Sequence, residues 1–131
     1  MVNFIILTLF SFTVLFSSSC ATAQTSDQVD ALLGTWKGER YHPRFGAEEQ
    51  TLVITKSSDG KLIGTLTSYF NGDKSKQKVE IRVSTENGSI ILQFTRIYRQ
   101  YSIYYNLTLA SDYLEGTAQA SALSNVKLTR Q

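Results

Sequence analysis

Apolar and polar residues alternate along most of the chain after residue 33, which is the period of a β-strand with one buried face. The alternating runs are short and are separated by turn signals such as Asp-Gly and Asn-Gly, and no stretch of ten residues has a convincing helical period. The pattern therefore predicts eight strands, at about 34–42, 49–56, 62–70, 77–84, 89–98, 101–109, 113–120 and 124–130.

The turns fix how these strands face one another. Residues 86–89 (Glu-Asn-Gly-Ser) are typical of a two-residue hairpin, residues 58–60 fit a three-residue loop with Gly60 in a left-handed conformation, and a third turn is expected at 99–100. Directly opposed residues share a face of the sheet. The turns then set these pairs opposite each other: Val83 with Leu92, Ile81 with Phe94, Ile54 with Gly64, Leu52 with Leu66, Phe94 with Tyr105, and Leu92 with Leu107.

One face of every predicted strand is largely apolar, so the strands can enclose a common core. Connections between neighbours favour an up-and-down meander, and its closure, with the last strand pairing the first, would remove the exposed sheet edges. We predict that Trp36 plugs one end of this barrel, where Gly38 and Gly64 leave room for its ring. The predicted inward set is Trp36, Gly38, Arg40, Leu52, Ile54, Leu62, Gly64, Leu66, Ser68, Phe70, Val79, Ile81, Val83, Ile90, Leu92, Phe94, Arg96, Ile103, Tyr105, Leu107, Leu109, Leu114, Gly116, Ala118, Ala120, Val126 and Leu128.

The first residues indicate export. Residues 4–16 are an apolar run that is too short to cross a bilayer but fits the core of a signal peptide, and Ala-Thr-Ala at 21–23 fits a cleavage site. We expect a signal peptide at 1–23, a polar leader at 24–32 and the barrel domain at 33–131, in a secreted or periplasmic protein without a stable membrane span. A membrane anchor, a buried strand, and lipid attachment at Cys20 remain alternatives.

The order of the motifs resembles a known fold family. Leu-Leu-Gly-Thr-Trp-Lys-Gly-Glu opens the domain, a Tyr-x-Leu-x-Leu strand starts at Tyr105, a glycine lies in the penultimate strand, and Val-Lys-Leu-Thr-Arg closes the chain. Over about residues 33–130 this arrangement resembles the small lipocalin-like, calycin-type β-barrels of secreted proteins from Bacteroidetes-type bacteria. The resemblance implies a binding module and carries no chemistry by itself.

Composition and motifs argue against several other classes of function. The net charge of +2 is too small to favour nucleic-acid binding. The chain contains no metalloprotease, nucleophile-elbow or phosphate-loop motif and no metal-ligand spacing, so we predict no catalytic residue, metal or cofactor. The single histidine, His42, leaves an enzyme as a remote alternative.

Polar and aromatic residues gather on the inward face at the end away from Trp36. Arg40 and Arg96 should both point into that half of the barrel, where Glu48 lies diagonally opposite Arg40 and Arg96 has no evident partner. Buried cations need an anion, a partner or water. We therefore predict a mouth that binds a small apolar or amphipathic, anionic ligand through Arg40, Ser68, Phe70, Phe94, Arg96, Tyr98, Tyr101 and Tyr105.

A different function remains open. The outward-facing Tyr69 and Tyr104, with the loop at 71–76, could instead form a surface for a protein partner, as in an inhibitor or interaction module.

Overall fold

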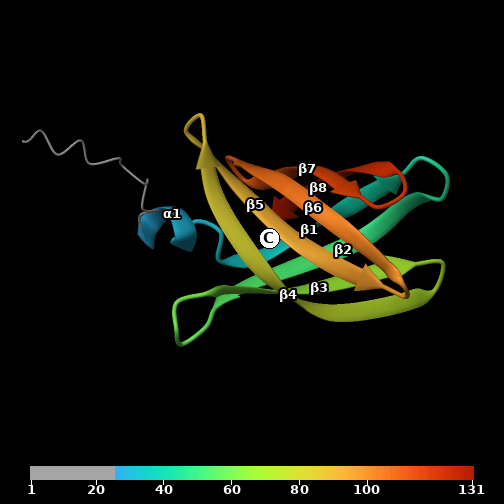
Figure 1. Cartoon of the computed structure of the whole chain (residues 1–131), viewed down its shortest axis with the longest axis horizontal. Helices are drawn as coiled ribbons and strands as arrows, with labels where there is room; N and C mark the ends of the chain where they lie inside the picture. The colour runs from blue at the N-terminus through green and yellow to red at the C-terminus, as the bar shows by residue number, and fades with distance from the viewer. Residues whose placement is uncertain (1–25) are drawn as a thin grey trace, which may run out of the picture.

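The strands close into one barrel. The structure is a computed structural model and describes residues 26–131, in which the strands join in chain order into a closed antiparallel barrel (Figure 1). The elements are α1 (Ser26–Asp30), β1 (Gly34–His42), β2 (Gly46–Lys56), β3 (Leu62–Phe70), β4 (Asp73–Glu86), β5 (Ser89–Tyr98), β6 (Tyr101–Ala110), β7 (Tyr113–Gln119) and β8 (Leu123–Arg130). The all-β, eight-stranded, antiparallel up-and-down barrel predicted from the alternation is thus confirmed, with β2 and β4 longer than expected.

The strand registers follow the predicted turns. Asn87 and Gly88 both have positive φ, as a type I′ turn requires, and Gly60 adopts the left-handed conformation (φ 84°) expected for the three-residue loop. The confirmed pairs are Val83 with Leu92, Ile54 with Gly64, Leu52 with Leu66, Phe94 with Tyr105, and Leu92 with Leu107.

The barrel closes between β1 and β8, as predicted, and Gly38 lies opposite Leu128 at this seam. A Cβ atom at Gly38 would lie 1.9 Å from the carbonyl oxygen of Lys127, so this glycine permits the close approach of the two strands. A Cβ at Gly64 would meet the side chains of Leu52, Val79 and Ile81. The prediction that both glycines make room for Trp36 was therefore wrong, because one admits a neighbouring backbone and the other admits aliphatic side chains.

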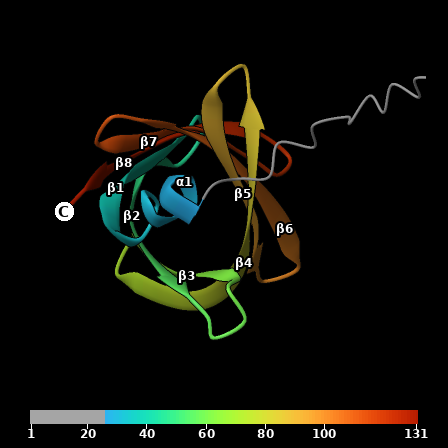
Figure 2. The same ribbon diagram turned by 90° about the vertical axis from the view of Figure 1, so that its left-hand side faces the viewer.

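One end of the barrel is closed by Trp36 and the segment before β1. The Trp36 ring is fully buried, its indole N–H donates to the carbonyl of Leu32 (2.9 Å), and the Arg130 guanidinium lies over the ring at 4.2 Å. Leu32 is also fully buried, and α1 lies across this end of the barrel (Figure 2). Trp36 is thus confirmed as a plug. Within the segment that the sequence indicated only as a polar leader, Leu32 belongs to the core and Val29 packs against it.

The predictions about the N-terminal segment are not tested by the structure. The signal peptide at 1–23, Cys20 and the start of the leader fall outside the described residues. Within residues 26–131, no helix is long and apolar enough to cross a membrane.

The ladder between β4 and β5 is incomplete. Their paired residues run from the 86–89 turn only to Arg82 and Gln93, one pair short of the predicted Ile81–Phe94 pair, although both strands continue toward the other end. Beyond that point β4 stays paired with β3, and β5 stays paired with β6. Two hydrogen bonds that involve side chains cross the opening instead. The backbone N–H of Ile97 donates to the side-chain oxygen of Gln77 (2.9 Å), and the Arg96 guanidinium donates to the Ser75 hydroxyl (3.2 Å). We call this opening the β4–β5 seam.

Candidate functional site

Buried polar side chains occupy the half of the barrel away from Trp36, which we call the mouth half. They lie on inward positions of strands whose other inward residues are apolar, so strand alternation itself turns them into the interior. This polar group consists of Arg40, Glu48, Gln50, Ser68, Arg96 and Ser124. The prediction that Arg40 and Arg96 enter the same half of the barrel agrees with this placement.

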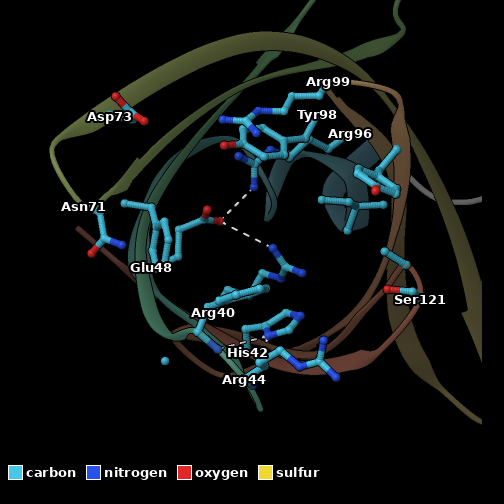
Figure 3. Close-up of a pocket in the computed structure, with 16 residues that line it drawn as sticks. Arg40, His42, Arg44, Glu48, Asn71, Asp73, Arg96, Tyr98, Arg99 and Ser121 are labelled. Carbon is cyan, nitrogen blue, oxygen red and sulfur yellow. Dashed lines mark hydrogen bonds and ion pairs between the residues drawn. The ribbon is translucent and has the colours of Figure 1, made fainter.

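Glu48 is the centre of the polar group. Its carboxylate accepts a hydrogen bond from Arg96 (2.8 Å), and Arg40 lies 3.7 Å away (Figure 3). The amide of Gln50 donates a second hydrogen bond to the same carboxylate (2.8 Å). Arg40 and Glu48 are directly opposite in the β1–β2 ladder, not diagonal, because β2 begins at Gly46, earlier than predicted. The expectation that Arg96 lacks a partner was wrong: Glu48 reaches it across the interior from β2 to β5.

Arg96 is held from several sides. Besides Glu48, it donates to the Tyr105 hydroxyl (3.5 Å) and to Ser75, and its guanidinium lies 5.1 Å from the centre of the Tyr98 ring. Burial by itself lowers the pKa of Arg96, but the Tyr105 hydroxyl and the Glu48 carboxylate outweigh this and raise that pKa above its ordinary value. Arg96 is therefore a fixed, permanently charged part of the mouth half.

Arg40 is much less well satisfied. Its side chain is only 9% exposed, its one ion pair within the described chain is the 3.7 Å contact with Glu48, and its Nε atom is buried without a hydrogen-bond partner among residues 26–131. Because Glu48 is already bonded to Arg96, one carboxylate stands against two guanidinium groups. The interior therefore carries about one uncompensated positive charge beside a buried donor, an arrangement that an anion would relieve.

A cavity of about 530 Å³ opens beside Arg40. It is lined by Arg40, His42, Arg44, Phe45, Gly46, Glu48, Phe70, Asn71, Asp73, Arg96, Tyr98, Arg99, Tyr101, Ile103, Ala120 and Ser121. The four arginines outnumber the two carboxylates in this lining. In Figure 3, Arg44 and Arg99 lie on opposite sides of the opening, with Arg40, Glu48 and Arg96 between them. A second, smaller cavity of about 230 Å³ adjoins Arg96 and Ser75 at the β4–β5 seam.

Aromatic rings form part of the wall. Phe45, in the β1–β2 turn, meets Phe70 edge-on at a centroid distance of 6.5 Å and also packs on His42 at 4.7 Å. Phe45 is nonetheless 63% exposed, so its ring sits at the rim of the cavity. Tyr98 lies near both Arg96 and Arg99 (5.1 and 5.4 Å from its ring centre), which fixes two cations beside one aromatic ring. The mouth thus offers both cationic and apolar contacts.

The structure separates the predicted site residues into two groups. Arg40, Phe70, Arg96, Tyr98 and Tyr101 line the larger cavity, and Ser68 lines the smaller one. Phe94 and Tyr105 line neither cavity, because their rings stack on each other at 4.4 Å and are buried in the core. Tyr105 still contributes its hydroxyl, which accepts from Gln50 at 2.7 Å. That these residues bind a ligand stays a prediction.

Several lining residues were missed by the sequence reasoning. Arg44, Phe45 and Arg99 lie in turns, where alternation gives no inward or outward direction. Gln50, which belongs to the buried polar group but lines neither cavity, could also have been found, because it shares strand parity with Leu52 and Glu48, and the sequence analysis had already placed Glu48 near Arg40. An amide between apolar neighbours on a buried face is itself a signal for a polar network.

Comparison with the solved structure of wild-type UnaG supports the barrel architecture. No protein-family model matches the chain, and no curated protein matches it. Among solved structures, wild-type fluorescent protein UnaG matches with a TM-score of 0.50 and 14% sequence identity, covering 79% of this chain and 99% of that one. Fatty-acid-binding protein 1 of Echinococcus granulosus matches with a TM-score of 0.49 and 12% identity, covering 77% of this chain and 98% of that one. Apo lipid binding protein 8 of Caenorhabditis elegans matches with a TM-score of 0.45 and 17% identity, covering 78% and 96%. At these identities the similarity concerns the barrel architecture alone.

Proposed function

We propose that this barrel is a non-catalytic binding module for a small amphipathic ligand with an acidic group, and that the acidic group binds at Arg40. The observation that carries the proposal is the buried, poorly partnered guanidinium of Arg40 beside a cavity of about 530 Å³. Small-molecule sites usually have volumes of roughly 300–1,000 Å³ and combine apolar walls with a few convergent polar groups. The Phe45, Phe70 and Ile103 side chains supply apolar wall in this cavity.

The existing contacts of the two arginines indicate which one binds the acidic group of the ligand. Arg96 is already bonded to Glu48, Tyr105 and Ser75, so its donors are largely used. Arg40 has unused donors and no closer anion than Glu48 at 3.7 Å. A carboxylate, sulfate or phosphate group at Arg40 would balance the second guanidinium while the apolar part of the ligand contacts the aromatic rim.

A binding role also fits the state of His42. Its Nδ1 atom accepts the backbone N–H groups of Arg44 and Phe45 (3.1 and 3.3 Å), so this nitrogen stabilises the β1–β2 turn. The one histidine of the chain is therefore engaged as a structural acceptor at the rim, which does not favour general-base chemistry.

The proposal extends to location. We propose export through the signal peptide at 1–23, which would give a secreted or periplasmic protein, or a lipid-anchored one if Cys20 is acylated. The apolar run at 4–16 and the Ala-Thr-Ala at 21–23 support it, and the intact mass of the exported chain would test it.

The ligand proposal is tested with an anionic fluorescent fatty-acid analogue and its neutral methyl ester. Arg40→Met should weaken binding of the acid by about 10-fold or more, the effect of one charge-assisted hydrogen bond, and should leave the ester nearly unaffected. Arg82→Met is the matched control, because Arg82 is an exposed arginine on β4 that lines neither cavity.

Two results would contradict the proposal. One is the absence of binding across a range of acidic, apolar probes. The other is equal weakening by Arg40→Met and Arg82→Met, which would indicate nonspecific attraction of the acid. Either result would favour the interaction module that acts through the outer surface.

A further inference from the structure

Within residues 26–131, the large apolar side chains that are exposed lie toward one end of the barrel. Six of them lie in what we call the mouth rim, the turns and strand ends at 41–47, 69–76, 97–102 and 119–124, and Tyr104 lies two residues beyond it on the outer face of β6. In Figure 1 these turns are on the opposite side of the molecule from α1. Each is at least half exposed; within residues 26–131 the full set of exposed large apolar side chains is Tyr41, Phe45, Tyr69, Ile97, Tyr101, Tyr104 and Leu123.

These residues form a collar and not a flat patch. They come from five different strands and one turn: β1, β3, β5, β6 and β8, and the β1–β2 turn. Tyr69, Ile97 and Leu123 alternate with buried inward residues and therefore point away from the barrel interior. A partner that contacts all of them has to surround the end of the barrel. A deformable, extended surface can do this, whereas a rigid, flat one cannot.

Basic side chains also outnumber acidic ones at the mouth rim. The mouth rim holds four basic side chains (Arg44, Lys74, Lys76 and Arg99) and one carboxylate (Asp73). The turns of the α1 end, at 28–33, 56–62, 85–90, 109–114 and 130–131, hold four side-chain carboxylates and three basic side chains. The end that exposes apolar surface is thus also the end with the positive excess.

We infer that the mouth rim docks on an anionic lipid bilayer, so that the cavity opens toward the membrane. Tyrosine rings suit the boundary between headgroups and acyl chains because each has an apolar body and a polar tip, and four of the seven exposed residues are tyrosines. Basic side chains beside such rings add attraction to anionic headgroups. This contact does not depend on the ligand proposed above, although a bilayer is a natural source of amphipathic molecules.

Binding to vesicles tests the inference. The protein is used as the expression host leaves it, with its N-terminus determined by mass spectrometry, and every variant carries the same N-terminal segment. Cosedimentation should be stronger with vesicles of phosphatidylcholine plus phosphatidylglycerol than with phosphatidylcholine alone, and it should weaken as salt rises. Equal binding to both kinds of vesicle, or to neither, would overturn the inference.

Matched substitutions locate the contact. The pair Tyr69→Thr with Tyr104→Thr removes two collar rings that line neither cavity and should reduce vesicle affinity by about 10-fold. Tyr113→Thr is the control, because Tyr113 begins β7 at the α1 end. Lys76→Glu should weaken binding more than Lys61→Glu, although both change the net charge equally. Equal effects within either comparison would overturn mouth-first docking.

Tryptophan fluorescence gives the orientation directly. Trp36 is the only tryptophan and is buried at the α1 end, so brominated lipids should leave its emission unchanged. A Tyr104→Trp variant should gain an emission component that the same lipids quench. Quenching of Trp36 alone, or capture of a stoichiometric protein partner by a chain that ignores vesicles, would refute the membrane assignment. Ligand affinity measured without vesicles is a separate readout, so failure of docking and failure of the ligand site are distinguishable.

Discussion

Removing the carboxylate of Glu48 should lower stability and strengthen anion binding at the same time. Glu48→Gln keeps the size of the side chain but removes the charge that Arg96 contacts at 2.8 Å and Arg40 at 3.7 Å. Breaking a buried ion pair by neutralising one partner typically costs about 3–5 kcal/mol, and a hydrogen bond to a charged group contributes about 1.5–3 kcal/mol. Because Glu48 borders the open cavity, water can reach it, and we expect about 2–3 kcal/mol.

Chemical denaturation and ligand titration measure the two effects. Glu49→Gln is the matched control, since the neighbouring Glu49 points out of the barrel and is exposed; it should change the free energy of unfolding by less than about 0.5 kcal/mol. In the same variant pair, Glu48→Gln should bind the anionic probe more tightly, because both guanidinium groups are then unbalanced. A Glu48→Gln protein as stable as the parent, or one with weaker anion binding, would refute the view that Glu48 holds the charge balance of the mouth.

Three further predictions concern the barrel. Gly38→Ala should lower the free energy of unfolding by about 2 kcal/mol or more in a denaturant titration, because its Cβ would press on the Lys127 backbone. Gly64→Ala should cost less, because the closest contacts of its Cβ would be the ends of aliphatic side chains. The reverse order would contradict the close approach of β1 and β8 at Gly38. Trp36→Phe should lose the bond to the Leu32 carbonyl and cost about 1–3 kcal/mol, and an unchanged thermal midpoint would show that the plug is not needed. Gln77→Ala should speed hydrogen exchange at the Ile97 amide, because that amide loses its acceptor. Gln93→Ala is the control, because Gln93 is exposed and lies in the paired part of the β4–β5 ladder. Equal exchange rates at Ile97 in the two variants would mean that Gln77 does not hold the β4–β5 seam.

Adjacent-strand geometry was largely readable from the sequence. Turn residues such as Asn87, Gly88 and Gly60 set registers, and alternation then assigned faces, including the inward direction of Arg40 and Arg96. A shift of one residue would have exposed the apolar neighbours of both arginines, so the pattern left little freedom.

Contacts across the interior were not readable. Glu48 and Arg96 meet from β2 and β5, and this depends on the curvature of the closed barrel, not on any pair of neighbouring strands. The β4–β5 seam was equally hidden, because alternation continues through strands whether or not their backbones pair. The short helix α1 gives too few residues for a helical period, and the structure shows through the burial of Leu32 and the packing of Val29 that this segment contributes to the core.

The most direct measurement is a crystal structure of the protein with dodecanoate bound. The account predicts electron density for the alkyl chain of dodecanoate in the cavity beside Phe45 and Phe70, with its carboxylate within hydrogen-bonding distance of the Arg40 guanidinium. A carboxylate that lies in solvent, or on the outer surface of the barrel with no contact to Arg40, would contradict the central claim.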